Sequence, residues 1–152
     1  MKKLITTLAL IVTAGCHSTA PTTTSAPVLN GNQTGAADPV AAIRGFMDAV
    51  KQQDIQAMGA IWGTAGGAAR DQMDRTYREK AEFIMICYLK HDSFDIIGGA
   101  PNPGGNRAYA VGLKLGPLTG STTFQVVQGP ANRWYVQDVD LKPLQEFCAR
   151  RG

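Results

Sequence analysis

The chain has 152 residues, of which 44% are apolar, and this length accommodates one modest domain. Its formal net charge of +3 includes two lysines at the N-terminus, Lys2 and Lys3. Without residues 1–15 the formal charge falls to +1, and no stripe of Lys and Arg remains that could neutralise several phosphates. The composition therefore excludes nucleic acid as a partner.

The first residues have the pattern of a targeting segment. Lys2 and Lys3 supply a positive start, residues 4–14 an apolar run, and residues 13–15 a small-residue step before Cys16. The apolar run is too short to cross a hydrocarbon layer, which needs about 20 apolar residues. The pattern resembles the signal peptide and lipobox of bacterial lipoproteins, whose cysteine is acylated and becomes the mature N-terminus.

This resemblance implies that residues 1–15 are a removed signal peptide and that Cys16 carries acyl chains such as palmitate. Two or more chains attach a protein stably to a membrane. A cleaved secretory signal without a lipid is the alternative, since it needs the same apolar run but no cysteine. In many lipoproteins, Asp after the acylated cysteine retains the protein in the inner membrane. His17 stands there instead, so we expect the outer membrane of the cell envelope, facing the periplasm.

Residues 16–37 are expected to carry the anchor and a disordered linker rich in Thr, Ser and Pro. From His17 to Ala37 there is no Asp, Glu, Lys, Arg, Phe, Trp or Tyr. Such a segment cannot bury enough apolar surface to offset the entropy of ordering it. The folded domain is therefore expected to span residues 38–152.

Two helices are expected at the start of this domain. Asp38 and Pro39 form an N-cap and first-turn pair, and apolar residues then recur at helical spacing over residues 40–50. Asp54 can cap a shorter helix that ends near Trp62. Residues 63–67, Gly-Thr-Ala-Gly-Gly, lack the Lys of a phosphate-binding loop and are expected to form a loop between helices.

A longer helix is expected over residues 68–90, with one buried apolar face and one charged face in solvent. The expected buried face contains Met73, Tyr77, Ala81, Ile84 and Cys87 or Tyr88. The expected solvated face contains Arg70, Asp71, Asp74, Arg75, Arg78, Glu79 and Glu82. Large aromatic side chains are likewise expected in the core rather than in a pocket. These are Trp62, Tyr77, Tyr88, Phe124, Trp134 and Tyr135.

After His91 the hydrophobic period changes from 3.6 to 2, which predicts strands. The four runs are residues 94–97, 109–115, 122–127 and 134–139, separated by turns rich in Gly, Pro and Asn. These runs predict a meander of about four antiparallel strands. A short C-terminal helix then starts near Asp140, with Leu144, Phe147 and Cys148 on one side and Arg150 and Arg151 in its last turn.

Helices followed by an antiparallel sheet predict an α+β fold, with N-terminal helices packed on a curved sheet. This order resembles the nuclear-transport-factor-2-like superfamily in residues 54–62, in the charged helix through residues 78–80, and in strands that end in residues 134–136. The helix from Pro143 to Arg151 departs from the simplest members. The resemblance implies a cone-shaped domain. Members include isomerases, dehydratases and non-catalytic binding domains, so the fold does not decide the function.

Cys87 and Cys148 remain once Cys16 is acylated. An even number of cysteines in an oxidising compartment favours a disulfide between them. The alternative is two free thiols that each fill an apolar site.

His91 and Asp95 are the candidates for acid–base chemistry, because a histidine beside carboxylates can move a proton at the mouth of a cone. We favour a structural role, in which His91 caps the C-terminus of the long helix and Asp92 starts the turn into a strand. His91, Cys87 and Cys148 do not have the spacing of a metal site, and no cofactor is expected.

The sequence therefore predicts a lipid-anchored bacterial envelope protein. Its domain is expected to bind a small apolar ligand or an envelope protein partner without turnover. One alternative is an isomerase- or dehydratase-like enzyme that uses the cone cavity. The other is a structural accessory of an envelope assembly, which would present an exposed apolar patch.

Overall fold

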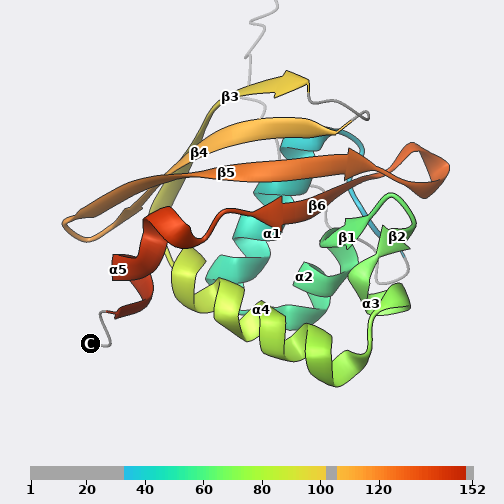
Figure 1. Ribbon diagram of the computed structural model, residues 1–152, viewed down its shortest axis with the longest axis horizontal. Coiled ribbons are helices and arrows are strands. Elements are labelled where there is room, and N and C mark those ends of the chain that lie inside the picture. The colour runs from blue at the N-terminus through green and yellow to red at the C-terminus, as the bar shows by residue number, and fades with distance from the viewer. Residues whose placement is uncertain (1–32, 102–105, 150–152) are drawn as a thin grey trace, which may run out of the picture.

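The computed structural model describes residues 33–101 and 106–149 (Figure 1). The N-terminal helices are α1 (Pro39–Gln52) and α2 (Ile55–Ile61), followed by the hairpin of β1 (Gly63–Thr64) and β2 (Gly67–Ala68) and by helices α3 (Ala69–Gln72) and α4 (Arg75–Leu89). The main strands are β3 (Ser93–Pro101), β4 (Arg107–Leu115), β5 (Leu118–Gln128) and β6 (Trp134–Val139), with the 3-10 turn η1 (Pro130–Asn132) before β6. The chain continues into η2 (Lys142–Leu144) and α5 (Gln145–Ala149). The predicted α+β class is confirmed.

Several predicted features lie outside the described residues. These are the signal peptide over residues 1–15, Cys16, His17, the linker up to residue 32, and Arg150 and Arg151. Within residues 33–101 and 106–149, no helix is both long enough and apolar enough to cross a membrane.

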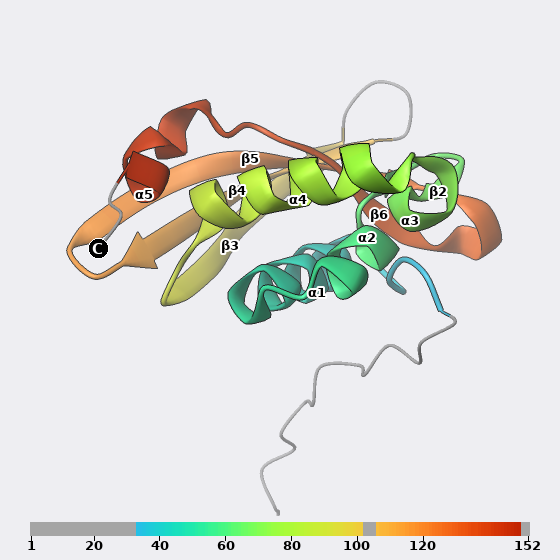
Figure 2. The same cartoon turned by 90° about the horizontal axis from the view of Figure 1, so that it is seen from below.

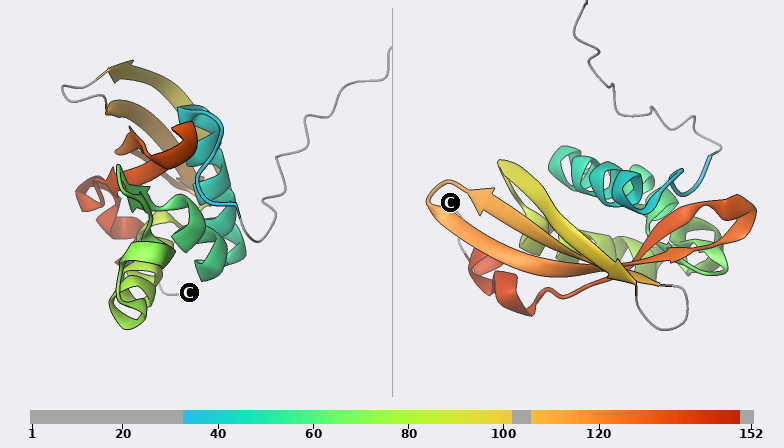
Figure 3. Two further views of the ribbon diagram at one scale, coloured as in Figure 1. Left: turned by 90° about the vertical axis from the view of Figure 1, so that its right-hand side faces the viewer. Right: turned by 90° about the horizontal axis from the view of Figure 1, so that it is seen from above.

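The main sheet is an antiparallel meander in the order β3-β4-β5-β6, as predicted. Its register places Phe94 opposite Leu113 and Tyr109 opposite Phe124, so their side chains share one face. Helix α1 packs against β5 and β6, and α4 lies beside α1, α2 and α5. Figures 2 and 3 show these helices beside the curved sheet. Helix α4 therefore packs against other helices on one side and is exposed to solvent on the other.

The space between the helices and the sheet is filled by the domain's own side chains. Phe46 of α1 and Phe124 of β5 meet edge to face, with ring centroids 6.2 Å apart. The same cluster contains these fully buried side chains: Ile43, Met47, Met58, Ile61, Leu89 and Val111. The core therefore joins all layers of the fold in one apolar cluster.

The first two helices begin where their capping residues predict. The Asp38 carboxylate accepts a hydrogen bond from the backbone N–H of Ala41 at 2.8 Å, and Pro39 occupies the first turn. The Asp54 carboxylate accepts from the backbone N–H groups of Gln56 and Ala57. Side-chain caps thus satisfy backbone donors that the first turn leaves unpaired.

The folded part extends further toward the N-terminus than the predicted boundary at residue 38. The backbone N–H of Gly35 donates to Ala60 O, and Ala36 and Trp134 exchange two backbone hydrogen bonds at 2.8 and 2.9 Å. Gly35 has φ +64°, and a Cβ there would lie 2.7 Å from the ring of Tyr135. The predicted linker therefore ends before residue 37, because these residues form an additional short strand-like contact with β6.

The helix predicted over residues 68–90 is two helices. Met73 has extended backbone, with φ −104° and ψ 149°, and α3 ends there. Asp74 then caps α4 by accepting a hydrogen bond from the backbone N–H of Tyr77 at 3.0 Å. The prediction of one helix was wrong because Asp74, read as a surface charge, is an N-cap. The loop predicted at residues 63–67 contains the β1–β2 hairpin.

Strands β3 and β5 are longer than the sequence predicted. Residues 118–121 of β5 pair with β4 across the tight turn at Gly116, where φ is +55°. Beyond Ile96, β3 continues past a register shift at Ile97 and pairs as far as Pro101. Pairing with β4 therefore overrides the weak strand propensity of the glycines in both strands.

Candidate functional site

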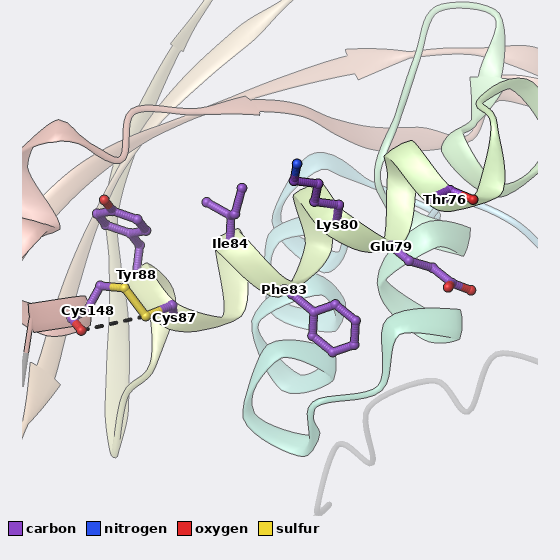
Figure 4. A pocket seen from close by; sticks show the side chains of 8 residues that line it. All are labelled: Thr76, Glu79, Lys80, Phe83, Ile84, Cys87, Tyr88 and Cys148. Carbon is purple, nitrogen blue, oxygen red and sulfur yellow. Dashed lines mark hydrogen bonds between the residues drawn. A yellow bond between two sulfur atoms is a disulfide. The ribbon is translucent and has the colours of Figure 1, made fainter. Parts of the chain in front are cut away.

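A surface groove runs along α4 and has a volume of about 570 Å³ (Figure 4). It is lined by Thr76, Glu79, Lys80, Phe83, Ile84, Cys87 and Tyr88 from α4 and by Cys148 from α5. We call it the α4 groove. One helix therefore supplies almost the whole surface, and the C-terminal helix closes one end of it.

Three large apolar side chains of α4 are exposed. Tyr77 is 66% exposed, Phe83 59% and Ile84 47%. At 3.6 residues per turn, Tyr77, Ile84 and Tyr88 form one ridge, Phe83 stands on the other side, and Lys80 and Cys87 lie between them. Figure 4 shows Ile84 and Phe83 projecting from the helix in different directions. The outer side of α4 thus carries one apolar ridge and a separate exposed ring, Phe83, with Lys80 between them.

The inner face of α4 is partly charged, which reverses the prediction. Arg78 is 5% exposed and Glu82 is fully buried, together with Met85 and Leu89. Tyr77 and Ile84 were expected inside, and Arg78 and Glu82 outside. The prediction was wrong because residues 83–89 are apolar on nearly every side of the helix. Periodicity alone then does not choose which stripe faces the core.

A small residue on α2 makes room for the buried ion pair. Arg78 Nε lies 3.4 Å from Glu82 Oε1. A Cβ at Gly59 would lie only 2.8 Å from Glu82 Oε1 and 3.3 Å from Arg78 Nε. The missing side chain of Gly59 therefore lets α4 turn its Arg78–Glu82 edge toward α2. This rotation leaves Tyr77 and Ile84 in solvent.

Glu82 is incompletely compensated in its buried position. Among the described residues, neither of its carboxylate oxygens has a hydrogen-bond partner, and nor does Arg78 Nε. Burial raises the pKa of Glu82 to about 7, which outweighs the opposing effect of Arg78, and the negative charge of Glu79 raises it further. The carboxyl group is therefore partly protonated at neutral pH.

The predicted disulfide is confirmed. Cys87 of α4 and Cys148 of α5 are bonded, with their Cα atoms 4.9 Å apart, and they are 61 positions apart in sequence. Next to the disulfide, Leu144 and Phe147 are buried beneath β5. They pack closely against Gly120 of β5, where an added Cβ would lie only 2.9 Å from Leu144. The bond thus holds α5 at the end of the α4 groove.

His91 and Asp95 do not line the groove. His91 is 6% exposed, its Nδ1–H donates to Leu89 O at 2.8 Å, and its ring meets Phe94 edge to face. Asp95 is exposed on β3, opposite Gly112. Asp92 accepts a hydrogen bond from the backbone N–H of Gly116 at 2.7 Å. The structure therefore places His91 at the end of α4 and ties Asp92 to the β4–β5 turn.

The aromatic residues divide between core and surface. Phe124 and Tyr135 are buried and Trp62, Tyr88 and Trp134 are partly buried, whereas Tyr77, also expected in the core, is exposed.

A second hollow of about 450 Å³ lies on the sheet. It is lined by Gly98, Gly99, Ala100, Ala108, Tyr109, Ala110 and Thr123. Within residues 33–101 and 106–149, no cluster of three or more His, Cys, Asp or Glu side chains could hold a metal ion.

A scan against protein-family models, a search of curated proteins and a search of solved structures find no match to this chain. The function must therefore be inferred from the groove itself.

The sequence pattern did not identify Lys80 and Phe83 as groove residues. The available signal was the uninterrupted apolar run Phe83-Ile84-Met85-Ile86, which is too wide for one buried stripe.

Proposed function

We propose that this chain is a lipid-anchored protein of the bacterial cell envelope whose domain binds a protein partner through the α4 groove, without turnover. The observation that carries the proposal is the exposure of Tyr77, Phe83 and Ile84 on a single helix. Contiguous exposed apolar surface marks interaction sites on soluble domains. A partner that covers these side chains gains the free energy of removing them from water.

The shape of the groove favours a protein partner over a small molecule. Small-molecule sites enclose most of the ligand, whereas the α4 groove is lined almost entirely by one helix, from which Phe83 and Ile84 project outward in different directions (Figure 4). The carboxylate in the groove, Glu79, is bound by Arg75 at 2.7 Å. The groove thus offers contact area rather than a free base for proton transfer.

The anchored location is supported by the lipoprotein-like segment that ends at Cys16. The disulfide agrees with it, because such bonds persist in oxidising compartments outside the cytoplasm. The superfamily assignment is likewise part of the proposal. It is supported by the order of α1, α2 and α4 before a four-stranded meander.

Replacing Cys16 with serine is expected to move the protein from the membrane fraction to the soluble fraction and to abolish labelling by palmitate. The reason is that acyl chains on this thiol would supply the membrane affinity. Fractionation and metabolic labelling measure both effects. The matched control is the double variant Cys87→Ser/Cys148→Ser, which should keep the label. A Cys16→Ser protein that still partitions with membranes contradicts the anchor.

A photo-crosslinking amino acid at position 84 is expected to capture a protein in native membranes, because Ile84 stands at the rim of the groove. The same amino acid at position 97 is the control. Ile97 is also apolar and is 68% exposed, but it lies on β3 away from the groove. Gel shifts of the adducts measure the capture. No adduct at position 84, or equal adducts at both positions, contradicts binding through the groove.

A further inference from the structure

We infer that the Cys87–Cys148 disulfide is a thiol–disulfide exchange site, at which a dithiol protein bound in the α4 groove reduces the bond and frees α5. This inference rests on the proposed binding role of the groove and adds a chemical reaction at its end. Three features of the fold carry it. The bond lines the groove, both of its cysteines are partly exposed, and α5 has one buried side chain of its own.

The disulfide is open to the groove. Cys87 and Cys148 both line it, and neither residue is buried. Figure 4 shows the two sulfur atoms at one end of the row of groove side chains, beside Tyr88. Exchange requires a thiolate to reach one of the two sulfur atoms, and exposed disulfides are more easily reduced than shielded ones. A thiolate therefore has access to this bond while the domain remains folded.

The groove brings a bound protein to the disulfide. Ile84 is 47% exposed and stands three positions before Cys87, so the two side chains are neighbours on the surface of α4. Tyr88 continues the apolar surface next to the bond. A protein that covers Ile84 thus has its own surface beside the sulfur atoms. Holding a thiol there makes its attack effectively intramolecular, which accelerates the exchange.

The exchange has two steps. A thiolate of the partner attacks one sulfur atom of the disulfide and forms a mixed disulfide, while the Cys87–Cys148 bond breaks and the other cysteine leaves as a thiolate. The partner's second thiolate then attacks the partner's own sulfur atom in the mixed disulfide, which releases the remaining cysteine. Two electrons pass from the partner to this chain, and the two protons lost by the partner's thiols end on Cys87 and Cys148. The partner is left with a disulfide of its own.

Reduction removes the covalent link that holds α5. Within this five-residue helix Phe147 is buried and Cys148 is partly exposed, whereas the other three residues are exposed. A helix of this length is not stable in water by itself. Leu144 and Phe147 then hold α5 to the sheet through few buried contacts, so it opens more readily than the main core. Because α5 closes one end of the α4 groove, its release opens that end beside Tyr88.

The test measures reduction of the folded chain carrying Cys16→Ser, which leaves Cys87 and Cys148 as its two cysteines. Reduced thioredoxin is the dithiol protein used as the probe, and dithiothreitol is the small dithiol used for comparison. Alkylation followed by mass measurement counts the free thiols. We expect both reagents to reduce the bond without denaturant, and hydrogen exchange at residues 145–149 to become faster while exchange in β4 and β5 does not change.

A groove variant tests whether docking contributes. Ile84→Glu is expected to slow reduction by thioredoxin about threefold or more and to leave reduction by dithiothreitol unchanged, because the small reagent needs no docking surface. The matched control Ile97→Glu changes an equally apolar exposed residue outside the groove and should slow neither reaction. Circular dichroism checks that each variant folds, and Ile84→Ser replaces Ile84→Glu should that variant unfold.

The outcomes separate this inference from the proposed function. A bond that is reduced only in urea overturns the exchange site, as does a reduced chain in which α5 exchanges no faster than before. Equal effects of the groove variant on both reagents overturn the docking step. If position 84 captures a protein while the folded bond resists reduction, the binding role stands and the exchange site fails. If thioredoxin reduces the bond through the groove while position 84 captures nothing, the exchange site stands and the proposed function fails.

Discussion

Replacing both Cys87 and Cys148 with serine is expected to lower the free energy of unfolding by about 4 kcal/mol. The bond closes a loop across 61 positions of sequence, so the oxidised unfolded chain has far fewer conformations than the reduced one. Replacing both residues leaves no unpaired thiol at either site. Urea unfolding of the oxidised chain and of the double variant measures the difference. Ala149→Ser, an exposed change on α5, is the matched control.

The same double variant should loosen α5 before the rest of the domain. Without the bond, α5 is held mainly by Leu144 and Phe147 beneath β5, whereas α1 and the sheet share the large apolar core. Hydrogen exchange at residues 145–149 should therefore speed up more than exchange in β4 or β5. A loss of stability below about 1 kcal/mol would show that strain in the native bond cancels its entropic benefit.

Features that depend on neighbouring residues were predictable from the sequence. The N-caps at Asp38 and Asp54 follow from the hydrogen bond that a carboxylate offers to the next turn. The meander follows from short apolar runs separated by turn residues, since such turns join adjacent antiparallel strands. The disulfide followed from an even cysteine count. Each of these features depends on local chemistry or on simple pairing.

The orientation of α4 could not be predicted, because it depends on a contact between distant elements. The helix has two stripes that could be buried, one with Tyr77 and Ile84 and one with Met85 and Leu89. Gly59 on α2 decides between them by accepting Arg78 and Glu82 at close range. No periodicity within α4 contains that information. The candidate site was therefore missed, although its residues had been assigned to the correct helix.

The N-terminal boundary was missed for a similar reason. Ala36 lies in a segment whose composition is typical of disorder, yet its backbone pairs with Trp134, nearly a hundred positions later. Arg133 reinforces the contact by donating hydrogen bonds to the carbonyl groups of Thr34 and Gly35. Backbone pairing stabilises a segment whatever its side chains are, so composition underestimated the folded part.

Replacing Glu82 with glutamine is expected to stabilise the protein at pH 8 and to remove part of its pH dependence. The carboxyl pKa is 4.5 in its ordinary state and about 7 in the fold. Between these values the folded state holds a proton that the unfolded chain has released. The stabilising contribution is therefore complete below about pH 4.5 and is lost as the pH rises through 7, a change of about 3 kcal/mol. Glutamine resembles the protonated carboxyl group and keeps this contribution at every pH.

Chemical unfolding at several pH values compares the parent chain with the Glu82→Gln variant. Their stabilities should agree near pH 4 and diverge progressively up to pH 8, with the variant the more stable. Glu146→Gln, on the exposed side of α5, controls for the loss of one carboxylate and should not diverge in this way. The opposite result, a less stable Glu82→Gln variant at pH 8, would mean that the ion pair with Arg78 outweighs the cost of burying both charges. In that case the orientation of α4 would depend on the attraction between Arg78 and Glu82 rather than on the apolar contacts of Met85 and Leu89.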